Sequence, residues 1–110
     1  MMTEATAKAA ALTEALPYIQ DFKGSVVLIK VGGSVMEVPE NLEGLLTDVA
    51  FMNAVGIKTV LVHGGGKAIS RGMTEAGVEP KFVMGLRVTD EPSVRVVDRV
   101  LGEVNANVVK

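Results

Sequence analysis

The chain has 110 residues, of which 48% are hydrophobic and 22% are charged, with a formal net charge of −2. This length suits one hydrophobic core and is too short for two ordinary domains. Eleven basic residues against thirteen acidic ones exclude the strongly basic surface of typical nucleic-acid-binding proteins. Without cysteine and with one histidine, the composition excludes disulfides, thiolate metal sites and histidine-rich metal clusters.

The sequence contains no apolar run close to the roughly 20 residues that a membrane-spanning helix needs. Glu4 and Glu14 interrupt the N-terminal segment, so it does not match the continuous apolar core of a secretory signal. We therefore expect a cytoplasmic protein.

Residues 3–20 are rich in alanine and are predicted to form a helix, without a clear N-cap residue before it. Leu12, Leu16 and Ile19 lie on one helical stripe, and Pro17 predicts that the helix ends or kinks near Leu16. So narrow a stripe suits docking onto another surface, such as a second subunit. A frayed tail is equally compatible with the pattern.

The apolar, β-branched run Val26–Val31 predicts a strand that is buried on both faces. Gly32 and Gly33 end this strand. A helix is predicted from near Pro39 to Gly56, and residues 58–62 form the next strand. Strand, helix and strand in this order make a βαβ unit with two parallel strands and a right-handed crossover.

A second helix is predicted over residues 67–76, followed by Gly77. Gly85 then separates two short apolar runs, which indicates a hairpin or a bulged excursion. Thr89 or Asp90 is expected to cap the last helix. The apolar positions of that helix suit helix pairing, within the chain or across a dimer; they are Val94, Val97, Leu101, Val104 and Val108. With only two long strands, the expected sheet has a thin core.

Three consecutive glycines, Gly64, Gly65 and Gly66, stand where the second strand passes into a helix. Backbone N–H groups at such a helix N-terminus bind anions, so we favour an anion site over a simple tight turn. The carboxyl ends of parallel strands lie at one edge of a sheet, which places Gly32 and Gly33 beside the three glycines. The P-loop and dinucleotide-binding patterns do not fit the residues that follow.

Two cations stand out near this edge. Lys30 lies in an otherwise apolar strand and could neutralise an anion as a point charge, although a lysine that extends into solvent is the alternative. Arg87 has the planar fork that binds carboxylates, but a surface hairpin arginine or a pair with Asp90 is as compatible. His63 is interpreted as structural and Lys67 as solvent-facing.

Three motifs, in this order and spacing, resemble the acetylglutamate kinases of the amino-acid kinase family. They are Ile29-Lys30-Val31-Gly32-Gly33, Val62-His63-Gly64-Gly65-Gly66 and Gly85-Leu86-Arg87-Val88-Thr89-Asp90. The resemblance covers nearly the whole chain from Val26 onward. It implies an α/β fold with three αβα layers and a mainly parallel sheet, of which residues 23–110 form the N-terminal, acyl-substrate lobe.

The resemblance also implies ATP-dependent phosphorylation of the side-chain carboxylate of N-acetyl-L-glutamate, a step of arginine biosynthesis. ATP is the co-substrate, with Mg²⁺ held mainly by its phosphates. Lys30 is the implied catalytic residue, which neutralises charge on the phosphoryl group, and Gly32 and Gly33 are implied to bind phosphate. The implied substrate-binding residues are Gly64, Gly65, Gly66 and Arg87, with Arg87 on the α-carboxylate.

The stretch Ala15-Leu16-Pro17-Tyr18-Ile19 resembles the N-terminal extension of the arginine-inhibited, hexameric members, so residues 1–22 are expected to form an oligomerisation helix. This implies a homo-oligomer, a dimer or a hexamer, with Tyr18 near an arginine site. Lys67-Ala68 and Val31 depart from the usual family residues. Family members are more than twice this length, and their other half carries the nucleotide site, so we expect the 110 residues alone to be inactive. A stand-alone binding or assembly module, or an amino-acid kinase acting on another carboxylate, are the alternatives.

Overall fold

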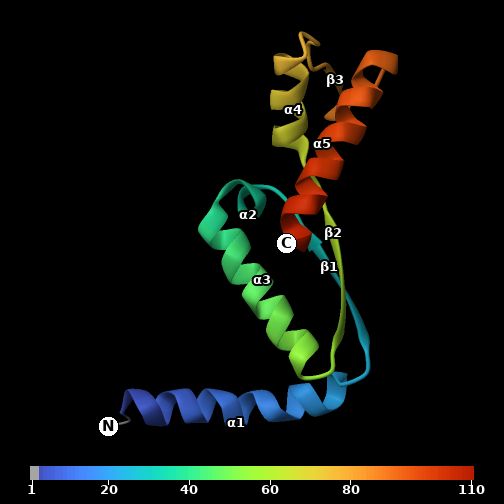
Figure 1. Cartoon of the computed structure of the whole chain (residues 1–110). Coiled ribbons are helices and arrows are strands. Elements are labelled where there is room, and N and C mark those ends of the chain that lie inside the picture. Colours follow the sequence, from blue (N-terminus) through green and yellow to red (C-terminus); the bar gives the residue numbers. More distant parts are fainter. Residues whose placement is uncertain (1–2) are drawn as a thin grey trace. The chain divides into compact units, whose positions relative to one another are not determined.

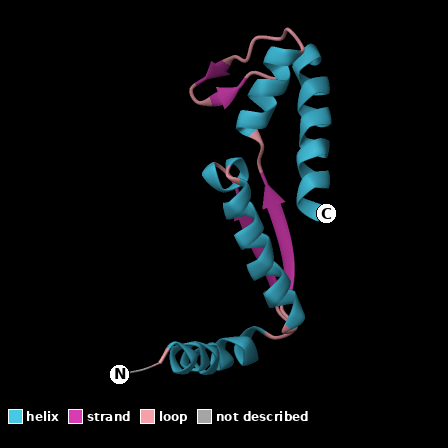
Figure 2. Cartoon of the chain, turned by 60° about the vertical axis from the view of Figure 1, so that its left-hand side comes forward, coloured by secondary structure: helices cyan, strands magenta, loops and turns pink. Residues whose placement is uncertain are grey.

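The computed structural model describes residues 3–110, which form a mixed α/β structure (Figures 1 and 2). The helices of this part are α1 (Glu4–Phe22), α2 (Ser34–Glu37), α3 (Pro39–Ala54), α4 (Gly66–Glu75) and α5 (Glu91–Val109). Its strands are β1 (Val26–Val31), β2 (Lys58–His63), β3 (Phe82–Val83) and β4 (Leu86–Arg87). The described residues fall into two compact units. The first unit runs up to Ile29 and includes Gly44–Leu61, and the second unit comprises Lys30–Glu43 and Val62–Lys110.

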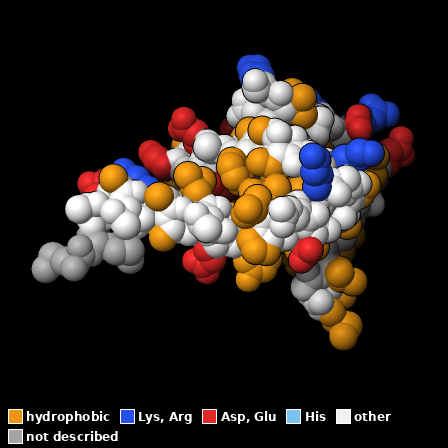
Figure 3. Space-filling view, turned by 90° about the horizontal axis from the view of Figure 1, so that it is seen from below, with side chains coloured by type: hydrophobic (Ala, Val, Ile, Leu, Met, Phe, Trp, Pro, Cys, Tyr) orange, Lys and Arg blue, Asp and Glu red, His pale blue; other side chains and the backbone are white. Residues whose placement is uncertain are grey.

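Helix α1 begins at a side-chain cap, because the Thr3 hydroxyl accepts a hydrogen bond from the Thr6 N–H at 3.2 Å. The expectation of no clear cap is therefore wrong. The helix continues through Pro17 to Phe22, so the expected end near Leu16 is also wrong, and the alternative of a kink there stays a prediction. Proline removes one N–H donor, and the hydrogen bonds of the flanking turns hold the helix together. None of its described residues is buried. The space-filling view from below in Figure 3 shows hydrophobic side chains exposed at the surface.

Strands β1 and β2 pair in parallel, as the sequence predicts. The Lys58 N–H donates to the Ser25 carbonyl at 2.9 Å, and the Gly64 N–H donates to the Val31 carbonyl at 3.1 Å. The two partners advance together along the chain, which is the pattern of parallel strands. With α3 between the strands in sequence, this is the expected βαβ unit.

The prediction that β1 is buried on both faces is wrong. Val26 and Leu28 are each 67% exposed, whereas Val27 and Ile29, which alternate with them, are partly buried. The alternation arises because α3 lies along one face of the strands in the first unit (Figure 2), and no described element of that unit covers the other face. The apolar run gives β1 its strand propensity but does not supply a second layer.

The tightest packing joins α4 to α5. The buried residues at this contact are Ile69, Met73, Val96 and Val100, with Met73 fully buried. Gly72 permits the close approach, because a Cβ atom there would lie 2.6 Å from Val100 Cγ2. The apolar seam predicted on the last helix thus pairs within the chain, and Val97, Leu101 and Val104 pack against this core. Pairing across a dimer stays a prediction.

The start of α5 confirms the expected cap at Asp90. Its Oδ1 accepts hydrogen bonds from the Ser93 N–H at 3.0 Å and the Ser93 hydroxyl at 2.6 Å. These two bonds stabilise the carboxylate and hold the pKa of Asp90 below its usual value.

The segment before α5 is a hairpin, in which β3 pairs antiparallel with β4. Met84 and Gly85 turn it with positive φ angles of 51° and 78°. No helix of the described residues is long and apolar enough to span a membrane.

Candidate functional site

The two glycine turns lie side by side, as predicted from the parallel strands. The hydrogen bond from the Gly64 N–H to the Val31 carbonyl joins the end of β2 to the residue before Gly32. Gly33 has a φ of 56°, a left-handed conformation that glycine adopts most easily. Gly65 has a tight neighbour instead, because a Cβ there would approach Leu101 Cδ2 to 3.1 Å and would displace that side chain slightly. Both turns thus bring bare backbone to one edge of the sheet.

Helix α4 begins at this edge with backbone N–H groups that have no partner within the helix. Its first intrahelical hydrogen bond runs from the Ile69 N–H to the Gly65 carbonyl at 2.7 Å. The N–H groups of Gly66, Lys67 and Ala68 precede that bond, and the N-cap residue Gly65 supplies no side-chain acceptor. Together with the positive end of the helix dipole, these donors favour an anion.

Arg87 is held against the same end of α4. One guanidinium nitrogen, Nη2, donates to the Gly66 carbonyl at 3.0 Å and to the Ser70 hydroxyl at 2.9 Å. The other, Nη1, lies 3.2 Å from Met73 Sδ, and the group stacks on the Phe82 ring at 4.7 Å. The side chain is half-buried, and its described contacts include none with Asp90, whose carboxylate caps α5. Arg87 therefore belongs to the α4 site and is neither a free surface arginine nor a partner of Asp90.

An open hollow of about 530 Å³ lies over these groups, all within the second unit. Its lining residues are Gly66, Lys67, Ser70, Arg71, Phe82 and Arg87. Three cations thus line a hollow at a helix N-terminus, where the dipole disfavours positive charge. Arg71 pairs with Glu37 at 2.9 Å, while Lys67 and Arg87 form no ion pair in the described part of the chain. The arrangement suits an anionic ligand.

Lys30 lies at the end of β1 with an exposed side chain. Its Nζ is 3.8 Å from the position that a Cβ would occupy at Gly32, so the ammonium group reaches over the first glycine turn. The side chain is therefore exposed to solvent and lies beside the turn at Gly32. Its catalytic role stays a prediction.

His63 has the structural surroundings that the sequence analysis expects. Its Nδ1 lies 2.9 Å from the Gly64 carbonyl oxygen, and its Nε2 lies 3.1 Å from Asn105 Oδ1 on α5. The ring therefore joins the end of β2 to α5. Lys67 is exposed, as expected.

The sequence analysis did not identify the partners of Arg87. Ser70 is one helical turn after Gly66 and thus shares its face of α4. Phe82 lies opposite Arg87 in the hairpin register. Helical spacing and hairpin pairing are the signals that could have found both residues.

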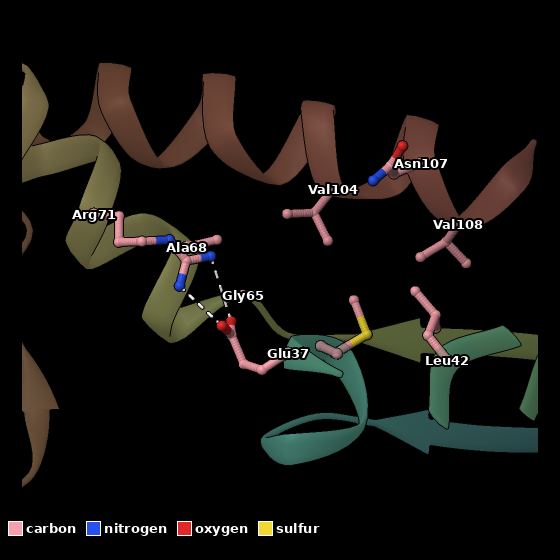
Figure 4. Close-up of a pocket in the computed structure, with 9 residues that line it drawn as sticks. Glu37, Leu42, Gly65, Ala68, Arg71, Val104, Asn107 and Val108 are labelled. Carbon is pink, nitrogen blue, oxygen red and sulfur yellow. Dashed lines mark hydrogen bonds and ion pairs between the residues drawn. The ribbon is translucent and has the colours of Figure 1, made fainter. Parts of the chain in front are cut away.

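A second hollow, of about 150 Å³, lies elsewhere in the second unit (Figure 4). Apolar side chains of α3 and α5 form much of it, including Leu42, Val104 and Val108. The ion pair between Glu37 and Arg71 closes one side. The sequence analysis did not predict this hollow.

Tyr18 lies on α1 in the first unit and is 63% exposed. Its expected place near an arginine site stays a prediction. The division of the chain into an oligomerisation helix over residues 1–22 and a substrate lobe over residues 23–110 also stays a prediction.

Comparison with known proteins decides the family. The sequence profile of the amino acid kinase family matches residues 25–110. The chain belongs to this family. Among curated members, acetylglutamate kinase of Aquifex aeolicus is 48% identical over 109 residues, which are 98% of this chain and 37% of that protein. Acetylglutamate kinase of Archaeoglobus fulgidus is 50% identical over 99 residues, or 89% of this chain and 34% of that one. This chain thus spans a little over a third of the length of these two relatives.

A solved structure supports the same fold. N-acetylglutamate synthase from Neisseria gonorrhoeae, complexed with coenzyme A and N-acetyl-glutamate, superposes with a TM-score of 0.74 and 30% sequence identity. The match covers 91% of this chain and 23% of the synthase. The mixed α/β fold with a parallel sheet is therefore confirmed as that of the amino acid kinase family.

Proposed function

We propose that the protein uses ATP to phosphorylate the side-chain carboxylate of N-acetyl-L-glutamate in arginine biosynthesis. The observation that carries this proposal is the position of Arg87, whose guanidinium lies at the N-terminus of α4 beside the glycine turn. An arginine fork at an anion-binding helix end suits a small dicarboxylate derivative. The similarity to acetylglutamate kinases over nearly the whole chain supports this choice of substrate.

Each site residue has a proposed role in this reaction. Arg87 binds the α-carboxylate, and the turn at Gly64, Gly65 and Gly66 binds the acyl group and the reacting carboxylate. The Gly64 N–H already donates to the Val31 carbonyl, so the N–H groups of Gly65 and Gly66 are the proposed donors. The carboxylate oxygen then attacks the γ-phosphorus of ATP, and ADP leaves. Lys30 neutralises the charge of the transferred phosphoryl group. The turn at Gly32 and Gly33 binds that group. Because phosphoryl transfer depends chiefly on positioning and charge stabilisation, these groups suffice for the acyl half of the site.

ATP is the proposed co-substrate, with Mg²⁺ held mainly by its phosphates. In a protein of the relatives' length, the region beyond this match supplies the nucleotide site. We further propose a cytoplasmic homo-oligomer, a dimer or a hexamer, assembled through α1. Its unburied face supports this role, and Leu12, Leu16 and Phe22 are each about half exposed or more. Tyr18 is the proposed contact to arginine.

The test is a kinase assay that detects the acyl phosphate formed from N-acetyl-L-glutamate and ATP. We expect product with N-acetyl-L-glutamate and much less with N-acetyl-L-aspartate, whose reacting carboxylate is one methylene closer. Lys30→Ala should lower kcat by about 10²-fold or more with a smaller change in KM, since its charge serves the transition state. Lys58→Ala is the matched control, because Lys58 is an exposed lysine at the opposite end of the neighbouring strand.

An effect of Lys30→Ala on KM alone would contradict the catalytic role. Binding of N-acetyl-L-glutamate without any acyl phosphate would favour the binding-module alternative. Preferred turnover of another carboxylate would favour a different amino-acid kinase.

A further inference from the structure

We propose that Ser70 is a positioning residue that fixes the orientation of Arg87 for the substrate carboxylate, with Phe82 supporting the guanidinium plane. This inference rests on the proposed function, in which Arg87 binds that carboxylate. It assigns Ser70 an effect on substrate affinity that acts through Arg87.

The hydrogen-bond geometry at α4 singles out Ser70. Arg87 Nη2 has two acceptors, the Gly66 carbonyl at 3.0 Å and the Ser70 hydroxyl at 2.9 Å. These acceptors lie one helical turn apart on the same face of α4, so together they fix both the place and the direction of Nη2. The Gly66 carbonyl is backbone and remains in any variant. The Ser70 hydroxyl belongs to a side chain, so a substitution can remove it from the described contacts of Arg87.

The hairpin completes the support of the guanidinium group. Phe82 pairs with Arg87 in the β3–β4 register, and its ring lies 4.7 Å from the guanidinium carbon. Stacking on a ring restrains the guanidinium plane while the hydrogen bonds restrain its rotation within that plane. The described contacts of Arg87 use both N–H donors of Nη2 and one of the two on Nη1, so the other Nη1 donor and the Nε donor are the ones proposed to meet the ligand, each by a single hydrogen bond.

Pre-orientation matters because a flexible arginine loses rotamer freedom when it binds a carboxylate. An arginine that is already ordered avoids that cost and binds more tightly without any new contact to the ligand. Removing the Ser70 hydroxyl should therefore weaken the binding of N-acetyl-L-glutamate and leave the binding of ATP unchanged. Met73 also contacts Arg87, but it is fully buried in the α4–α5 core and its substitution would alter folding.

The experiment is calorimetric titration of the purified native protein with N-acetyl-L-glutamate and, separately, with ATP. Ser70→Ala should raise the Kd for N-acetyl-L-glutamate about tenfold, as expected for a hydrogen bond to a charged group. Ser70→Thr keeps a hydroxyl and should restore affinity to within about threefold of the native value. Thr74→Ala is the matched control, because it also removes a hydroxyl from α4. That hydroxyl donates to the Ser70 carbonyl and not to Arg87. This variant should leave both affinities unchanged.

A double-mutant cycle separates this inference from the proposed function. In an Arg87→Ala background, Ser70→Ala should change the Kd for N-acetyl-L-glutamate less than twofold, because its target is gone. An equal effect in both backgrounds, or no effect in the native background, would overturn the positioning role while the proposed function stands. If Arg87→Ala itself leaves this Kd unchanged, the clamp and the positioning role are both overturned.

Discussion

The α4–α5 pair and the part of the β1–β2 sheet that lies in the first unit bury their apolar side chains to very different extents. Met73 is fully buried between α4 and α5, and Val100 is 5% exposed. In contrast, Val26 and Leu28 on β1 are each 67% exposed, although their residue types are as apolar. Sequence pattern therefore predicts which face of an element is apolar, and the neighbouring elements decide whether that face is covered.

The proposed site depends on the better packed of these regions. Arg87 contacts Gly66, Ser70 and Met73 on α4, and α4 is fixed by its core with α5. Gly65 lies close to Leu101 of α5, and the His63 ring lies within hydrogen-bond distance of Asn105 of α5. The helix pair thus holds the proposed anion-binding end of α4 in place, which is what a site that works by positioning requires.

The largest expected effect contrasts one residue from each region. Met73→Ala should destabilise the protein by about 2–5 kcal/mol, because it leaves a cavity in a closed core. Leu28→Ala should change stability by no more than about 0.5 kcal/mol in the 110-residue chain, because Leu28 is mostly exposed. Urea unfolding of both variants gives the two values. Similar costs would show that the outer sheet face is covered in solution and would remove the contrast.

A smaller effect is expected from two helical glycines with different surroundings. Gly72→Ala places a Cβ 2.6 Å from Val100 Cγ2 and should cost about 1–3 kcal/mol by forcing α4 from α5. Gly102→Ala meets no atom within 4 Å and should stabilise α5 by up to about 1 kcal/mol. The thermal midpoint should therefore fall in the first variant and rise in the second. A rise in both would contradict the close approach of the two helices.

The smallest expected effect concerns the cap of α5 and its pH dependence. The hydrogen bonds from Ser93 lower the pKa of Asp90 in the folded state, so the unfolded state binds the proton more readily. The stabilisation from Asp90 is therefore present above the unfolded pKa, near 3.8, and is lost as the pH falls through the lower folded value. Asp90→Ala should lower the thermal midpoint at neutral pH. Asp90→Asn keeps an acceptor and should lose only the acid-dependent part, and an unchanged acid profile would contradict this assignment.

Much of the fold could be predicted from local pattern. The parallel βαβ unit, the Gly85 turn and the Asp90 cap follow from strand propensity, glycine and capping chemistry, and all three are present. The failures have physical reasons. The helix continues past Pro17 because one missing hydrogen bond does not end it. The burial of β1 depends on a second layer that its own residues cannot specify.

The candidate site could be predicted in part. The proximity of the two glycine turns follows from parallel strands, and Lys30 and Arg87 stand out as charges within apolar segments. The partners of Arg87 depend on how the hairpin folds back onto α4, which brings residues 17 positions apart into contact. Sequence spacing alone does not show such a contact.

The most direct test of the account is the affinity of the Arg87→Ala variant for the two proposed ligands. Calorimetric titration of the purified native protein should show a loss of N-acetyl-L-glutamate affinity of about tenfold or more, with little change for ATP. Arg95→Ala is the control, because Arg95 is an exposed arginine paired with Glu91 on α5. A selective loss for N-acetyl-L-glutamate would support the carboxylate clamp at the N-terminus of α4. An equal loss for both ligands, or none for either, would contradict it.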